Sequence, residues 1–298
     1  MKHFALIGAA GYIAPRHMRA IKETGNVLVA ALDKHDSVGI LDSYFPEADF
    51  FTEFERFDRH LEKLKRNGNP VDYVVVCSPN YLHDAHIRFG LRLGADVICE
   101  KPVVLNPWNV DALMEMEKET GKKVFTVLQM RLHPAIIALR EKVMKAPPEK
   151  KFNVTLRYIT IRGHWYQISW KGDMQKSGGI ATNIGIHFFD ALLWIFGDVK
   201  QNKVCQHDST KASGQLMLDR ANINWSLSID ANDLPEQTKA TGKQSFRSLV
   251  IDEDEIEFGD SFNQLHTKVY EEILAGYGYK LSEVKKSVEL VYRIRNKC

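Results

Sequence analysis

The sequence lacks the features that define several classes of protein. Its four cysteines, Cys77, Cys99, Cys205 and Cys298, form no C-x-x-C pair, so reduced thiols in a cytoplasmic protein are the simplest account. The 40 basic and 38 acidic residues leave a net charge of only +2 and are interspersed, which argues against nucleic acid or another polyanion as partner. No apolar run approaches the ~20 residues of a membrane span, and no repeat or low-complexity tract is present.

Alternating strand-like and helix-like segments fill the first half of the chain. This alternation is typical of βαβ units and a parallel sheet. Strands are expected at 3–8, 27–33, 73–78, 96–100 and 124–128, and helices at 16–23, 57–67, 83–93 and 108–120. The sequence therefore predicts an α/β Rossmann domain that binds a dinucleotide, over residues 1–125.

A second domain is expected over residues 126–298, for substrate binding and oligomerisation. Pro147-Pro148 breaks the βαβ pattern, and alternating apolar and polar segments follow, which predicts a largely antiparallel, half-buried open sheet in an α+β domain. Strands are expected at 151–161, 200–207, 212–218, 221–229 and 246–251, and helices at 136–144, 263–274 and 281–295.

A glycine turn follows the first expected strand and reads G-x-x-G-x-x-A from Gly8 to Ala14. Gly8 permits the tight turn, and Gly11 lets the backbone approach a pyrophosphate at the start of the next helix. Asp33 closes the second strand, where a carboxylate accepts the ribose hydroxyls of NAD and repels a 2′-phosphate. NAD is therefore favoured, although the neighbouring Lys34 and His35 leave NADP open.

Two further strand ends carry polar residues. Glu100-Lys101-Pro102 ends a short apolar run, at the edge of an open α/β sheet where ligands bind. Ser78-Pro79-Asn80 ends the preceding strand and is the natural contact for the nicotinamide half of the cofactor. Each motif alone also fits an ordinary solvated strand end or a helix cap.

The stretch from Ser177 to Asp190 places polar groups among large apolar residues. Asn183, His187 and Asp190 follow at helical spacings of four and three, so all three can share one helix face. A buried structural helix rarely carries three polar groups in step, which favours a functional face over a satisfied core histidine.

Together these motifs resemble the Gfo/Idh/MocA family of oxidoreductases, over essentially the whole chain. The resemblance rests on the glycine turn, Ser78-Pro79-Asn80, Glu100-Lys101-Pro102, the run from Gln129 to Pro134, and Gly185-x-His187-x-x-Asp190 followed by Trp194. It implies that Lys101 and His187 are the catalytic residues. Many family members carry aspartate at the position of Asn183, so an aspartate–histidine relay is not expected here.

Four further segments resemble one branch of the family, which oxidises UDP-N-acetylglucosaminuronate at C3 in the bacterial pathway to diacetamido uronic acids of lipopolysaccharide O-antigen. They are 41–46, 162–166, 169–173 and 176–183. In that branch the asparagine at 183 is expected. The resemblance implies a downstream aminotransferase and a homodimer or homotetramer. Two alternatives to this function remain. One is an inositol or aldose dehydrogenase of the same family, and the other is an NAD-binding regulator or scaffold without catalysis.

In this interpretation His187 is the base, since histidine titrates near neutral pH, and Lys101 stabilises charge on the reacting oxygen. A uronate diphosphate needs cations. The aromatic rings of Trp165, Tyr166 and Trp170 could stack on a uracil or a sugar, with packing in the core as the alternative. The substrate-binding candidates are Arg16, Arg131, Arg162, Trp165, Lys171, Ser177 and Asn183. The cofactor-binding candidates are Gly8, Gly11, Tyr12, Ile13, Asp33, Ser78, Pro79, Asn80, His83, Glu100, Lys101, Gln129 and Trp170. No metal is expected.

Overall fold

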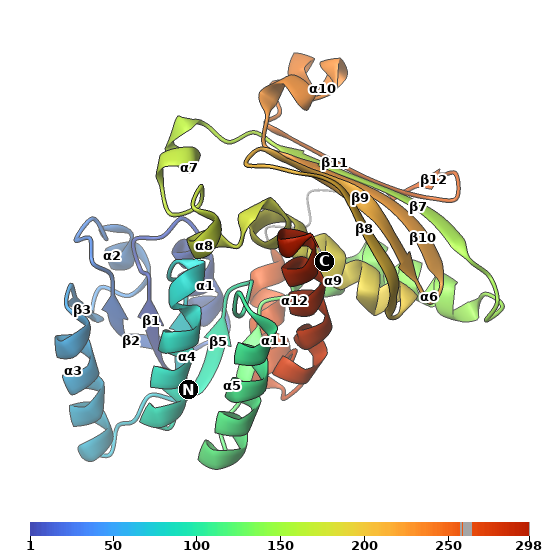
Figure 1. The fold of residues 1–298 in the computed structure, drawn as a ribbon. Helices are drawn as coiled ribbons and strands as arrows, with labels where there is room; N and C mark the ends of the chain where they lie inside the picture. The colour runs from blue at the N-terminus through green and yellow to red at the C-terminus, as the bar shows by residue number, and fades with distance from the viewer. Residues whose placement is uncertain (257, 259–263, 298) are drawn as a thin grey trace. The chain divides into compact units, whose positions relative to one another are not determined.

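The structure is a computed structural model that describes residues 1–256, 258 and 264–297 (Figure 1). The fourth cysteine of the sequence lies outside the described residues. The chain divides into two compact units, which are described separately: Met1–Gln129 with Asn263–Lys285, and Met130–Phe262 with Lys286–Cys298.

The first unit contains a six-stranded parallel sheet in the order β3-β2-β1-β4-β5-β6. Val74, Val75 and Val76 of β4 are fully buried, as continuous apolar strands covered on both faces should be. The strand order reverses between β1 and β4, and this reversal marks the place where ligands bind in open α/β sheets. The strands are β1 His3–Ile7, β2 Val27–Leu32, β3 Asp49–Phe51, β4 Tyr73–Val76, β5 Asp96–Cys99 and β6 Val124–Thr126.

Helices connect these strands. α5 begins with a proline, which suits a first helical position, and ends at Gly121 with φ +68°, as the sequence predicts for a C-terminal cap. The helices of this unit are α1 Ala14–Glu23, α2 Ile40–Tyr44, α3 Phe54–Arg66, η1 Asn80–Leu82, α4 His83–Leu93, α5 Pro107–Thr120 and α11 Leu265–Leu274.

The described residues 264–285 belong to the first unit, whereas the sequence predicted a second domain over all of 126–298. α11 packs against α1, and the backbone N–H of Thr126 donates to the carbonyl of Tyr279. A β-bridge between Phe125 and Lys280 extends the same edge of the sheet. These contacts are far apart in sequence, so periodicity alone gave no sign of them.

The second unit contains a six-stranded sheet in the order β12-β11-β7-β10-β9-β8. β7 and β10 pair in parallel and every other pair is antiparallel. Figure 1 shows α6 and α9 lying along one face of this sheet. The strands are β7 Phe152–Thr160, β8 Val199–His207, β9 Lys211–Leu218, β10 Ala221–Ser228, β11 Ser245–Ile251 and β12 Asp254–Glu255.

The core of the second unit lies between the sheet and its helices. Phe189 of α9 meets Trp225 of β10 edge to face, with ring centroids 5.2 Å apart. Alternate residues of β7 are buried and exposed, as the half-buried pattern predicts. The remaining helices are η2 Gln129–Leu132, α6 Pro134–Lys145, α7 His164–Ile168, α8 Met174–Ser177, η3 Ala181–Gly185, α9 Ile186–Phe196, η4 Ala231–Asp233, α10 Glu236–Ala240 and α12 Leu281–Asn296.

One helical stretch among the described residues, Met174–Phe196, is long and apolar enough to cross a membrane. From the sequence, no apolar run long enough to span a membrane was expected. In the structure 72% of its most apolar part is buried, and Phe189 and Phe196 within it belong to the core. It is therefore accounted for as a core helix of this unit.

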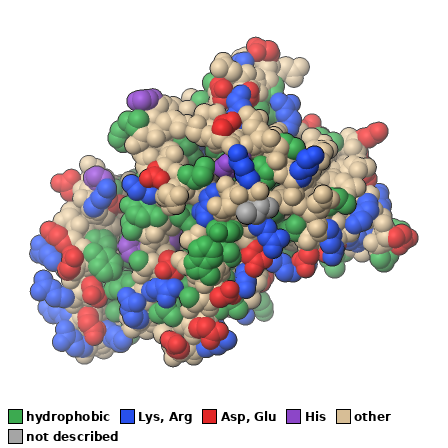
Figure 2. All heavy atoms as spheres, in the orientation of Figure 1, with side chains coloured by type: hydrophobic (Ala, Val, Ile, Leu, Met, Phe, Trp, Pro, Cys, Tyr) green, Lys and Arg blue, Asp and Glu red, His purple; other side chains and the backbone are tan. Residues whose placement is uncertain are grey.

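The α/β class, the Rossmann sheet and the mostly antiparallel second sheet confirm the predicted fold. The short elements α2 and β3 were not predicted, because five and three residues are too few to show a period. On the face drawn in Figure 2, Lys and Arg side chains are interspersed with Asp and Glu, in agreement with the nearly balanced composition.

Candidate functional site

The glycine turn lies between β1 and α1, next to the reversal of strand order. The backbone N–H groups of Gly8 and Ala9 donate to the carbonyl of Leu32, at 2.8 and 3.1 Å. Asp33 accepts from the N–H of Ala10 at 3.0 Å through one carboxylate oxygen and from the N–H of His35, also at 3.0 Å, through the other. The carboxylate thus sits beside the turn, where the sequence places the ribose contact.

Gly8 fits this turn because no larger residue can. Its φ is +95°, and a Cβ there would lie 2.6 Å from the carbonyl carbon of Cys77 and 2.7 Å from its oxygen. The backbone of the neighbouring strand therefore crosses directly against the turn. This close approach is the cradle that a pyrophosphate needs, so the residues present fit a bound dinucleotide.

We expect Gly8→Ala to weaken NAD binding by at least about tenfold and to cost about 1–3 kcal/mol of stability, because the backbone must shift to relieve the contact with Cys77. Titration of NAD by calorimetry and thermal unfolding measure both effects. Gly39→Ala is the control, since its added Cβ would meet no atom within 4 Å. Unchanged NAD affinity in Gly8→Ala would contradict the placement of the cofactor at this turn.

Two other predicted segments follow neighbouring parallel strands. Ser78-Pro79-Asn80 comes after β4 and Glu100-Lys101-Pro102 after β5, so both turns stand at the same edge of the sheet. Lys101 is partly exposed, whereas Ser78 and Asn80 are buried. Tyr12 is 84% exposed and Ile13 partly exposed at the start of α1. The Oε1 atom of Gln129 is buried and lacks a hydrogen-bond partner among the described residues.

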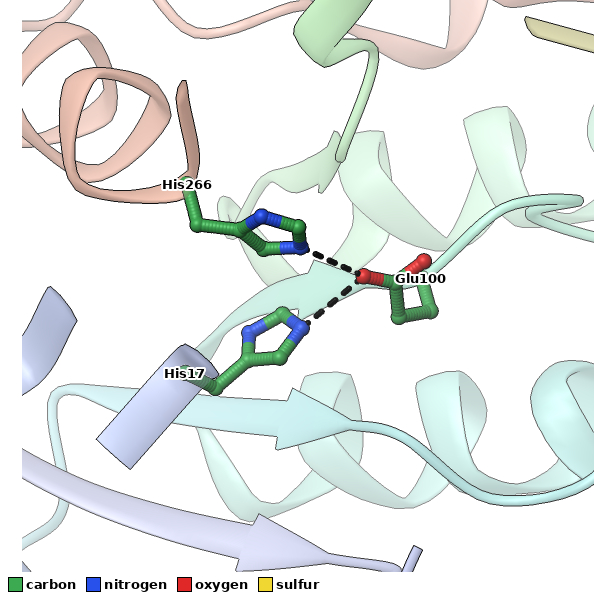
Figure 3. A group of neighbouring side chains, drawn as sticks. All are labelled: His17, Glu100 and His266. Carbon is green, nitrogen blue, oxygen red and sulfur yellow. Dashed lines mark hydrogen bonds and ion pairs between the residues drawn. The ribbon is translucent and has the colours of Figure 1, made fainter. Parts of the chain in front are cut away.

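Glu100 lies below this edge in a buried triad with two histidines (Figure 3). Its Oε1 atom accepts from Nε2 of His17 at 3.0 Å and from Nε2 of His266 at 3.2 Å. His17 also meets the hydroxyl of Tyr270 at 2.8 Å through Nδ1. Burial pushes the pKa of Glu100 upward, but the hydrogen bonds from His17 and His266 outweigh it, so the pKa lies well below its ordinary value.

Glu100, predicted to contact the cofactor, is 7% exposed, and its carboxylate is bonded inside the unit. His17, Glu100 and His266 are also a possible metal-binding group, with ligand atoms within 4.8 Å of one another. Both imidazoles hydrogen-bond the same carboxylate oxygen directly, at 3.0 and 3.2 Å. The triad is therefore a hydrogen-bonded support beneath Lys101.

In the second unit a π-helical turn, η3, leads directly into α9. From Ile180 to Leu193 every residue is buried except Asn183 and His187, which are partly exposed. They come one helical turn apart, as the sequence predicts. π-turns inside helices are frequent at functional sites because the extra residue re-aims the side chains around it.

Asp190 does not share the face of Asn183 and His187. Its carboxylate is 1% exposed and forms two hydrogen bonds with Arg131, both at 2.8 Å, from Nε and from a terminal guanidinium nitrogen. Arg131 is itself 4% exposed. This buried bidentate pair joins η2 to α9 and gives Arg131, predicted to bind substrate, a partner within the unit.

Asn183 contacts Tyr166, whose ring the sequence analysis assigned only to stacking or to the core. Its side-chain amide donates to the hydroxyl of Tyr166 on α7 at 2.7 Å. Tyr166 is 7% exposed, and burial raises its pKa, so the phenol stays protonated. The contact orients the amide of Asn183 next to His187 on the same unit.

We expect Tyr166→Phe to lower kcat/KM about 2–10-fold with a loss of stability near 1 kcal/mol, because one hydrogen bond to Asn183 disappears without a change of shape. Steady-state kinetics and thermal unfolding measure the two effects. Tyr277→Phe removes an exposed hydroxyl from the first unit, and should leave kcat/KM within twofold. Equal effects of both substitutions would contradict the positioning of Asn183 by Tyr166.

The other substrate candidates of the second unit gather around α7 and α8. Arg162 and Trp165 are exposed, Trp165 by 77%, and the guanidinium carbon of Arg162 lies 6.0 Å from the centre of the Tyr166 ring. The Lys171 amine lies 5.7 Å from the centre of the half-buried Trp170 ring. Burial, with a smaller effect of Arg162, lowers the pKa of Lys171, so a bound anion there would stabilise its charge.

Two more residues were predicted to bind substrate, Ser177 and Arg16. Ser177 is fully buried. Its hydroxyl donates to the carbonyl of Asp173 at 2.9 Å and accepts from the N–H of Gly179 at 3.0 Å. Arg16 is partly exposed and lines a hollow of about 310 Å³ in the first unit, together with Arg19 and Tyr44.

The structure thus groups the expected residues within each unit: the glycine turn, Asp33, Asn80 and Lys101 in the first, and Arg162, Lys171, Asn183 and His187 in the second. It adds His17 and His266, which the sequence analysis did not assign, and the hydrogen bond from Asn183 to Tyr166. His17 could have been noticed as a histidine on the apolar face of its helix. His266 is separated from Glu100 by 166 residues, and no pattern relates them.

Comparisons with known proteins agree with this geometry. Residues 2–128 match the family model described as "Oxidoreductase family, NAD-binding Rossmann fold", and residues 150–227 match "Oxidoreductase family, C-terminal alpha/beta domain". Among curated relatives, the putative oxidoreductase YteT of Bacillus subtilis is 28% identical over 51% of this chain and 36% of its own length. Inositol 2-dehydrogenase of Rhizobium meliloti is 26% identical over 82% of this chain and 67% of its own length.

Solved structures give a fuller match. The WlbA (WbpB) dehydrogenase of Thermus thermophilus, in complex with NAD and α-ketoglutarate, is 48% identical, with a TM-score of 0.96. The match covers 99% of this chain and 95% of that one. The complex of the same dehydrogenase with NAD and UDP-GlcNAcA has a TM-score of 0.95 with the same identity and coverage.

Proposed function

Because the chain belongs to the Gfo/Idh/MocA oxidoreductase family, we propose that it is an NAD-dependent dehydrogenase that oxidises the C3 hydroxyl of UDP-N-acetylglucosaminuronate to the 3-keto sugar. The observation that carries this proposal is the 48% identity, over 99% of the chain, to a dehydrogenase whose structure holds NAD and UDP-GlcNAcA. Asn183 supports the same branch of the family.

In the proposed reaction two units contribute different groups. Gly8, Gly11 and Asp33 of the first unit hold the pyrophosphate and the adenosine ribose, and the bound NAD supplies a hydride acceptor. His187 of the second unit takes the hydroxyl proton as the C3 hydrogen leaves with its electron pair. Lys101 stabilises the negative charge that develops on the oxygen.

The substrate is held by its charges and by its rings. Arg162 and Lys171 face the uronate or the diphosphate, and Trp165 offers an exposed ring for stacking on uracil or on the sugar. Asn183, oriented by Tyr166, hydrogen-bonds a sugar hydroxyl or the acetamido group without transferring a proton.

The direct test is turnover of UDP-N-acetylglucosaminuronate by the purified protein with NAD. We expect a 3-keto product, detected by mass spectrometry, and faster net turnover with 2-oxoglutarate if bound NADH is recycled in place. myo-Inositol and glucose serve as parallel substrates. Turnover of one of these without turnover of the UDP-sugar would establish the inositol or aldose dehydrogenase alternative, which the match to inositol 2-dehydrogenase keeps open.

We further propose that the enzyme acts in the cytoplasm as a homodimer or homotetramer, in the synthesis of diacetamido uronic acids of lipopolysaccharide O-antigen. The uncovered face of the second sheet, with its alternating exposed residues, supports pairing between copies. A 3-keto product has the chemistry that an aminotransferase consumes. Light scattering of the purified protein tests the oligomeric state.

A further inference from the structure

His83, expected to bind the cofactor, instead joins the two turns at the edge of the parallel sheet. It is the first residue of α4 and is 1% exposed. Its Nδ1 atom lies 2.7 Å from the carbonyl oxygen of Pro102, and its Nε2 atom lies 2.8 Å from the carbonyl oxygen of Ser78. One ring therefore spans from the turn after β4 to the turn that carries Lys101.

Both partners of this ring are hydrogen-bond acceptors only. A backbone carbonyl oxygen has lone pairs and no proton, and a neutral imidazole carries a proton on one nitrogen alone. In a neutral ring, one nitrogen lone pair would face a carbonyl lone pair at less than 2.9 Å. Only the imidazolium form donates from both nitrogens, and its two hydrogen bonds are then charge-assisted.

The charges around the ring act in both directions. Burial is the largest effect, and with a contribution from Lys101 it leaves the pKa of His83 below its ordinary value, against the carbonyls of Pro102 and Ser78 and the carboxylate of Glu100, which raise the pKa. The second proton is therefore assigned by the two carbonyl contacts at 2.7 and 2.8 Å and not by the surrounding charges. Glu100 is ionised, since its own pKa is held well below the ordinary value, so an imidazolium at His83 gives this buried anion a countercharge.

His86, three residues after His83 on α4, contacts the hydroxyl of Ser78 and is neutral. Burial, with a smaller effect of His83, lowers the pKa of His86 to about 4, so His86 is neutral at pH 7. Its Nδ1 lies 2.8 Å from the hydroxyl of Ser78 and can accept that proton. On the same helix Asp84 pairs with Arg88 at 2.8 Å. One charged and one neutral histidine thus hold the carbonyl and the hydroxyl of Ser78.

We propose that His83 is a positioning residue: as an imidazolium it ties the Ser78-Pro79-Asn80 turn to the Lys101-Pro102 turn and thereby sets the place of the Lys101 amine. The role in catalysis rests on the proposed function, in which Lys101 acts on the reacting oxygen. The protonation state does not rest on it, because it follows from the two carbonyl contacts alone.

The protonation state can be measured on the wild-type protein without substrate. In protein labelled with ¹⁵N in the histidine rings, the His83 signals are assigned by their loss in His83→Gln. We expect both ring nitrogens of His83 to carry protons at pH 7, and those of His86 to show one protonated and one bare nitrogen. An unprotonated ring nitrogen on His83 at pH 7 overturns the proposal that His83 is an imidazolium, whatever the kinetics show.

The positioning role is tested by kinetics of the full-length protein. We expect His83→Gln to lower kcat about 10–100-fold and to change KM for UDP-N-acetylglucosaminuronate less than threefold, because one amide nitrogen cannot reach both carbonyls and Lys101 shifts. His60→Gln, on α3 of the same unit and paired there with Asp49, should keep kcat within threefold. If both ring nitrogens are protonated but His83→Gln keeps wild-type kcat, the positioning role is overturned. If wild-type protein lacks turnover, the proposed function fails instead.

Discussion

His187→Ala should lower kcat about 10²–10⁴-fold while the Kd for NAD changes less than about twofold. The imidazole is partly exposed within an otherwise buried helix, the only titratable group among residues 180–189 of the second unit, so no neighbour on that stretch replaces it as base. In the proposed function NAD is held by the glycine turn and Asp33, which belong to the first unit.

The measurement combines steady-state kinetics on UDP-N-acetylglucosaminuronate with calorimetric titration of NAD. His60→Ala, which removes a histidine paired with Asp49 in the first unit, is the control and should leave kcat within twofold. The same pair of measurements separates the enzyme from an NAD-binding regulator: a regulator would bind NAD equally well with and without His187 and turn over nothing. Wild-type kcat in His187→Ala would show that another group is the base.

Asp190→Ala should cost about 3–5 kcal/mol of stability, because it leaves the guanidinium of Arg131 buried without its carboxylate. Both side chains are nearly inaccessible, and both bonds of the pair are 2.8 Å long. The large cost reflects the uncompensated charge more than the strength of the ion pair itself.

Denaturant unfolding of the variants tests this interpretation. The double substitution Arg131→Met with Asp190→Leu should recover most of the stability, since apolar residues of similar volume can replace a buried pair at little cost. A loss below about 1 kcal/mol in Asp190→Ala would mean that water or another acceptor reaches Arg131. Such a result would restore Arg131 as a candidate for the substrate.

The roles of polar residues at the ends of buried strands were only partly predictable. Asp33 stands beside the glycine turn as expected, because the spacing from strand to turn is local. Glu100 and His83 were assigned to the cofactor, but they bond to His17, His266 and two backbone carbonyls inside the unit. Their partners come from residues up to 166 positions away, and sequence spacing holds no record of such contacts.

The positions of the polar residues around His187 were also only partly predictable from the sequence. Helical spacing predicted one face for Asn183, His187 and Asp190, and the first two are indeed the partly exposed residues of the stretch. Asp190 is instead buried and bonded to Arg131. Arg131 lies 59 positions before Asp190, and helical spacing holds no record of a partner on another element.

By itself the sequence determined the α/β class, the order of the long strands and helices, the glycine turn and the family. These depend on local periodicity, on turn residues and on motifs a few residues long. The tertiary structure alone decided that α11 joins the Rossmann unit, and that Arg131, Glu100 and His83 are buried with partners inside their units. The physical reason is burial: whether a charged side chain meets a ligand or a partner depends on which distant elements pack around it.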